Sequence, residues 1–95
     1  MTKYQEYFQK MMDDRFQQFQ RFRQVHDNYV KDPDKWKLQF NKEGSLILDI
    51  IREWERRLCA HSEKGQYGKF SANLADKFWG EVRKIFPKID FVGVE

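Results

Sequence analysis

The residues best suited to chemistry in this chain are a histidine, a glutamate and an arginine in its first half. His26 and Arg15 fall on the apolar side of a helix expected over the first third of the chain, and Glu43 falls on the apolar stripe of the next helix. If the two helices run antiparallel about Pro33, Glu43 lies near residue 21, within about 9 Å of either partner along the axis. Buried charges need partners, so we expect a structural pair between Glu43 and His26 or Arg15. Acid–base or metal chemistry is the alternative, but two or three side chains do not complete a ligand set.

A second candidate is the glycine-containing segment around residues 64–71. Gly65 and Gly68 have two residues between them and Phe70 follows Lys69, whereas a phosphate-binding loop needs four residues between its glycines and Ser or Thr after the lysine. The Gly-x-x-Gly pattern also occurs in the RNA-clamping loop of KH domains, but those domains need a sheet that this chain has no room for. We therefore predict a helix–helix connection. Its basic and aromatic tip is expected to contact a protein groove or stack on bases through Lys64, Tyr67, Lys69 and Phe70.

Cys59 is the single cysteine, so this chain cannot form an internal disulfide, and we expect a reducing, cytoplasmic setting. His61 is two residues away and cannot share a helix face with it, which argues against a nucleophile–base pair. We predict no catalytic residue, no metal site and no cofactor.

Three helices are expected to position these residues. The first covers residues 2–31, begins with Thr2 as N-cap and ends before Asp32-Pro33. Its apolar residues occupy about half of the helix circumference at ~100° per residue. They are Tyr4, Tyr7, Phe8, Met11, Met12, Phe16, Phe19, Phe22, Val25, Tyr29 and Val30.

The second helix is expected over residues 34–60 as one element, because its apolar stripe stays in phase across Gly44. A loop at 61–71 leads to a third helix at 72–86, capped by Ser71 and ended by Pro87. Residues 87–95 are expected to form a short strand or an extended arm, with Phe91 and Val94 as partner contacts.

Composition agrees with one small helical domain. The chain has 95 residues, 17% of them aromatic, with only five Gly and two Pro. We therefore predict an all-α fold: a long antiparallel helical hairpin plus a shorter third helix and an extended C-terminal arm, similar to a three-helix bundle. The net charge of +3 is spread along the chain rather than concentrated in a basic block.

The unequal lengths of the three predicted helices favour a binding function. A third helix of about 15 residues covers only half of the hairpin, and uncovered apolar surface is typical of a binding site. We expect a helical protein–protein interaction module, acting as scaffold, adaptor or regulatory subunit, with another protein or a second copy of itself as partner. The alternative is a small nucleic-acid-associated protein that uses dispersed Lys and Arg and the loop aromatics. No apolar run approaches the length of a membrane span, so no membrane partner is expected.

Overall fold

The computed structural model of the chain describes residues 2–63 and 68–93, and the side chains of residues 61–72 lie outside this description. The described part consists of helices and connecting turns without strands, which confirms the all-α prediction. In chain order the elements are α1 (Lys3–Asp14), α2 (Phe16–Lys31), α3 (Pro33–Glu63), α4 (Gly68–Ile85) and the 3₁₀ turn η1 (Ile89–Phe91).

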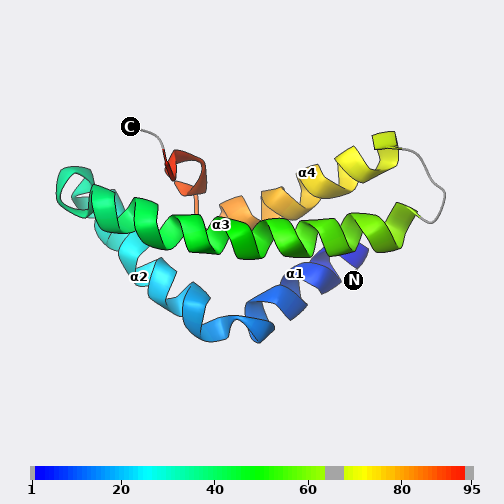
Figure 1. Ribbon diagram of the computed structural model, residues 1–95, viewed down its shortest axis with the longest axis horizontal. Coiled ribbons are helices and arrows are strands. Elements are labelled where there is room, and N and C mark those ends of the chain that lie inside the picture. Colours follow the sequence, from blue (N-terminus) through cyan, green and yellow to red (C-terminus); the bar gives the residue numbers. More distant parts are fainter. Residues whose placement is uncertain (1, 64–67, 94–95) are drawn as a thin grey trace.

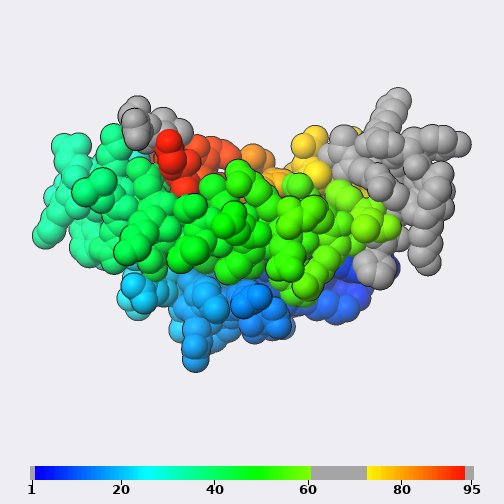
Figure 2. Space-filling model, in the orientation of Figure 1, coloured from blue at the N-terminus to red at the C-terminus, as the bar shows by residue number. Residues whose placement is uncertain are grey.

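The molecule is elongated, with extents of 47 × 26 × 18 Å. Figure 1 shows α3 along the full length, with α1 and α2 on one side of it and α4 with η1 on the other. In the space-filling view, α3 forms a continuous band along the middle of the face shown (Figure 2). Tyr7 contacts Trp54 and Arg21 contacts Glu43, so α1 and α2 run antiparallel to α3.

Local signals explain where these helices begin. The Thr2 hydroxyl accepts a hydrogen bond from the Gln5 backbone N–H, and the Gln5 side chain accepts one from the Thr2 N–H, which forms a capping box. At the start of α3, the Asp32 carboxylate accepts from the Lys35 N–H at 3.3 Å. The helix then runs without interruption across Gly44, as its in-phase apolar stripe predicts.

The prediction of one unbroken helix over residues 2–31 is wrong. The chain breaks at Arg15, where φ is −116° and ψ is 36°, although neither glycine nor proline is present. Arg15 occupies a position on the apolar stripe, and its Nε is buried without a hydrogen-bond partner among the described residues, 3.5 Å from Asp14 Oδ2. The break leaves the Arg15 side chain 42% exposed and turns α1 so that it contacts α4 as well as α3.

Two other predicted boundaries and the predicted C-terminal element are also wrong. Residues 61–63 continue α3, and α4 begins at Gly68, so Ser71 lies inside a helix instead of capping one. A glycine lowers helix propensity by about 1 kcal/mol but does not by itself end a helix. Residues 89–91 form a 3₁₀ turn in place of a strand or extended arm, because Ile89 is buried against the helices.

Aromatic rings fill the core between the layers. Phe22 stacks on Phe40 at 5.6 Å and meets Phe86 edge-on at 5.0 Å, so α2, α3 and the residue that follows α4 share one cluster. At the other end, Phe8 packs edge-on against Phe78. Edge-to-face pairs of this kind add roughly 0.5–1.5 kcal/mol beyond the burial of their area.

Candidate functional site

His26 is a polar residue buried in the core, with 3% of its surface exposed. Its Nε2 accepts a hydrogen bond from the backbone N–H of Lys88 at 3.2 Å, and its Nδ1 lies 3.2 Å from Asp27 Oδ1. An accepting Nε2 carries no proton, so the neighbours assign the neutral ring with its proton on Nδ1. Both ring nitrogens have partners, and the residue joins α2 to the segment after α4.

The expected pairing of Glu43 with His26 or Arg15 is wrong. Glu43 pairs instead with Arg21, at 2.6 Å between Oε1 and Nε. The antiparallel register puts Glu43 directly opposite Arg21, so the nearer cation takes the carboxylate. Arg15 is the single residue between α1 and α2, and its Nε is 3.5 Å from Asp14 Oδ2.

The C-terminal segment, residues 88–93, is fixed to three helices. Arg83 of α4 donates two hydrogen bonds to the Asp90 carboxylate, at 2.9 and 3.2 Å, and this contact raises the pKa of Arg83. The Gly93 N–H donates to Asn41 Oδ1 of α3 at 2.9 Å. Val92 fills the space beside Gly44, where an added Cβ would be 2.6 Å from a Val92 methyl carbon.

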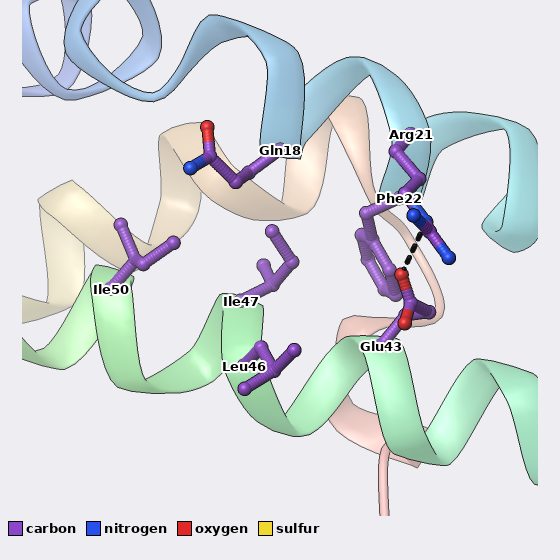
Figure 3. Close-up of a pocket in the computed structure, with 7 residues that line it drawn as sticks. All are labelled: Gln18, Arg21, Phe22, Glu43, Leu46, Ile47 and Ile50. Carbon is purple, nitrogen blue, oxygen red and sulfur yellow. Dashed lines mark ion pairs between the residues drawn. The ribbon is translucent and has the colours of Figure 1, made fainter.

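A small pocket lies between α2 and α3 and encloses about 220 Å³. Figure 3 shows apolar side chains of α3 along its floor and the Arg21–Glu43 ion pair across one end. Leu46 is its most exposed apolar residue, at 60%. Arg21 and Glu43 already pair with each other. The pocket therefore offers a partner mainly apolar surface, with few free polar groups to select among partners. We call it the α2–α3 pocket: Gln18, Arg21, Phe22, Glu43, Leu46, Ile47 and Ile50.

A longer depression lies on the other side of α2, between α2 and the end of α4. It consists of three hollows of about 240, 460 and 180 Å³ that share lining residues. Arg23 and Ile85 line both the first and second hollows, and Val30 lines both the second and third. We call this surface the α2–α4 groove. Its principal lining residues are Met12, Phe16, Phe19, Arg23, Asp27, Val30, Lys31, Ile85, Phe86, Pro87, Lys88 and Phe91.

The groove combines exposed apolar side chains with a basic rim. Phe16, Val30 and Phe91 are 56%, 49% and 45% exposed and line this one surface, and contiguous exposed apolar residues are typical of interaction sites. Arg23 and Lys31 stand beside them without an ion-pair partner among the residues described. The arrangement therefore offers an apolar floor flanked by positive charge, which suits recognition rather than bond-making.

The structure describes only some of the predicted site residues. Lys64, Tyr67 and Val94 lie outside the described residues; Lys69 and Phe70 belong to the first turn of α4, and their side chains are not described. Phe91 borders the α2–α4 groove, with the Lys88 ammonium 5.0 Å from its ring centroid.

Phe16, Arg23 and Val30 of the groove were not among the predicted site residues. The width of the apolar stripe on the first predicted helix nevertheless indicates that some of its residues stay exposed. An arc of about half the circumference is wider than the ~100° a core-facing helix needs, and Phe16 and Val30 sit toward its edge.

Comparison with known protein families, curated proteins and solved structures finds no match for this chain. Within the described residues, no group of three or more His, Cys, Asp or Glu side chains is placed to hold a metal ion. None of the described helices has the length and apolar character needed to cross a membrane.

Proposed function

We propose that this chain is a helical protein–protein interaction module and that its binding surface is the α2–α4 groove. The observation that carries the proposal is the run of exposed apolar side chains along that groove. Phe16 and Val30 lie on one side of α2 and are about half exposed, next to Ile85 of α4 and the apolar residues that follow it. Binding would remove this surface from water, at roughly 25 cal/mol per Å² of apolar area.

The groove is open because α4 packs on α1 and α3 more than on α2. Helix-in-groove recognition uses such a surface: a partner helix places apolar residues at i, i+3, i+4 and i+7 between two helices. We further propose that the chain, with its antiparallel helices, acts as a scaffold, an adaptor or a regulatory subunit. A reducing, cytoplasmic setting stays a prediction from the single cysteine.

The test is selection from a phage-displayed library of helical peptides against the whole chain. We expect the selected peptides to bind the wild type and to lose binding when Phe16→Glu places a charge in the groove. Leu46→Glu is the matched control, because Leu46 is as exposed as Phe16 but lies in the α2–α3 pocket. Circular dichroism would verify that both variants stay folded. Failure to select any peptide sensitive to Phe16→Glu would overturn the proposal.

A second candidate function is binding to RNA or a single strand. The observation that favours it is the Lys88 ammonium beside the half-exposed Phe91 ring, since aromatic rings next to cations bind stacked bases. An oligouridine probe would then bind with an affinity that falls steeply as salt rises. Peptide binding that is lost with Phe16→Glu, without oligouridine binding, favours the first function.

A further inference from the structure

We propose that the occupant of the α2–α4 groove is an acidic amphipathic helix, whose apolar stripe is flanked by Asp and Glu. This inference rests on the proposed function and specifies the chemistry of its partner. Three observations support it: the length of the groove, the charge on its rim, and the repulsion that a symmetric dimer through the groove would create.

The groove is long enough for a helix. Phe16, Arg23 and Val30 are separated by seven residues each, so they share one face of α2. From Phe16 to Val30 this face extends about 21 Å, which is the length of roughly four helical turns. Ile85 and Phe91 supply the opposite wall and end. A partner helix of about 16 residues matches this length.

The rim carries excess positive charge. Arg23 and Lys31 have no ion-pair partner among the described residues, whereas Lys84 is held by Glu81 at 2.6 Å. The hydrogen bond to Glu81 and the charge of its carboxylate raise the pKa of Lys84, so this residue stays cationic as well. The groove's acidic residue, Asp27, lies beside the His26 ring. Carboxylates on both flanks of a bound helix would form ion pairs with these cations and set the orientation of the helix.

The same charges argue against a second copy of this chain as occupant. In a two-fold dimer the same patch of both subunits meets. Such a contact through the groove would bring Arg23 and Lys31 toward the same cations of the other copy, and like charges at an interface oppose association. A separate acidic segment avoids this repulsion.

The experiment uses a phage-displayed library of 16-residue helices with a fixed Leu stripe and Glu, Gln or Lys at the flanking positions. On wild-type protein we expect selection to enrich Glu over Lys at these flanks by about tenfold or more, equivalent to about 1.4 kcal/mol. The double variant Arg23→Glu/Lys31→Glu should reverse the preference. The matched control Lys42→Glu/Arg56→Glu changes two exposed cations of α3 that line neither surface, and should leave it unchanged.

The outcomes separate this inference from the proposed function. Peptides that depend on Phe16 but show equal or greater enrichment of Lys would overturn the acidic partner and leave the interaction module standing. An absence of any Phe16-dependent peptide would overturn both. Two further results would also overturn the acidic partner: a dimer in sedimentation velocity that dissociates with Phe16→Glu, or oligouridine binding abolished by Arg23→Glu/Lys31→Glu.

Discussion

Replacing Gly44 by alanine tests whether the C-terminal segment docks on α3. A glycine-to-alanine change inside a helix ordinarily stabilises the protein by about 1 kcal/mol. Here the added Cβ would lie 2.6 and 2.8 Å from two methyl carbons of Val92, about 1 Å inside normal contact distance. Overpacking of this kind costs roughly 1–3 kcal/mol. We therefore expect Gly44→Ala to leave the free energy of unfolding unchanged or to lower it by up to about 2 kcal/mol.

The decisive measurement is a double-mutant cycle with Val92→Ala, followed by urea unfolding monitored by circular dichroism. In the Val92→Ala background the methyl groups are gone, so Gly44→Ala should raise the free energy of unfolding by about 1 kcal/mol. The cycle then gives a coupling energy of roughly 1–3 kcal/mol. Gly80→Ala is the matched control, since nothing lies within 4 Å of the added Cβ, and it should stabilise both backgrounds equally. If Gly44→Ala stabilises the wild type as much as Gly80→Ala does, Val92 does not occupy that space in solution.

Three further predictions concern contacts that hold the helices and the C-terminal segment together. His26→Phe keeps a ring in the core but leaves the Lys88 N–H without its acceptor, and should cost about 1–3 kcal/mol in urea unfolding; no loss would mean that this bond does not form. Arg83→Ala removes the pair with Asp90, whose side chains are 47% and 61% exposed, and should cost at most about 1 kcal/mol. The Arg83→Ala loss should shrink as NaCl is added, and a larger, salt-independent loss would contradict a solvent-screened pair. Phe78→Ala removes a fully buried ring and should cost about 3–5 kcal/mol; thermal unfolding near the wild-type temperature would refute its place in the core.

Helix starts that depend on local signals could be predicted from the sequence. Thr2 caps α1 and Asp32 caps α3, because each side chain reaches a backbone N–H three residues ahead. The phase of the apolar stripe across Gly44 likewise predicts one helix. These signals involve neighbours in sequence, so they need no knowledge of tertiary contacts.

The break at Arg15 could not be predicted from propensity, since no proline or glycine marks it. Its cause is tertiary: α1 contacts α4, whereas α2 packs mainly on α3. His26 presents the same difficulty, because its acceptor role involves Lys88, which is 62 residues away. A residue's type and stripe position indicate that it needs a partner, but they do not identify the partner.

The groove follows from a mismatch between the width of the α2 stripe and the surface available to cover it. Phe19, Phe22 and Val25 are buried because α3 and the end of α4 cover the middle of the arc. The edge of the arc at Phe16 and Val30 extends beyond this cover, and η1 closes only one end of the opening. Adding apolar residues to that edge contributes little to the core of the isolated chain, since their side chains remain about half exposed. Their stabilising effect would come from association, and the cations beside them restrict which helix can bind.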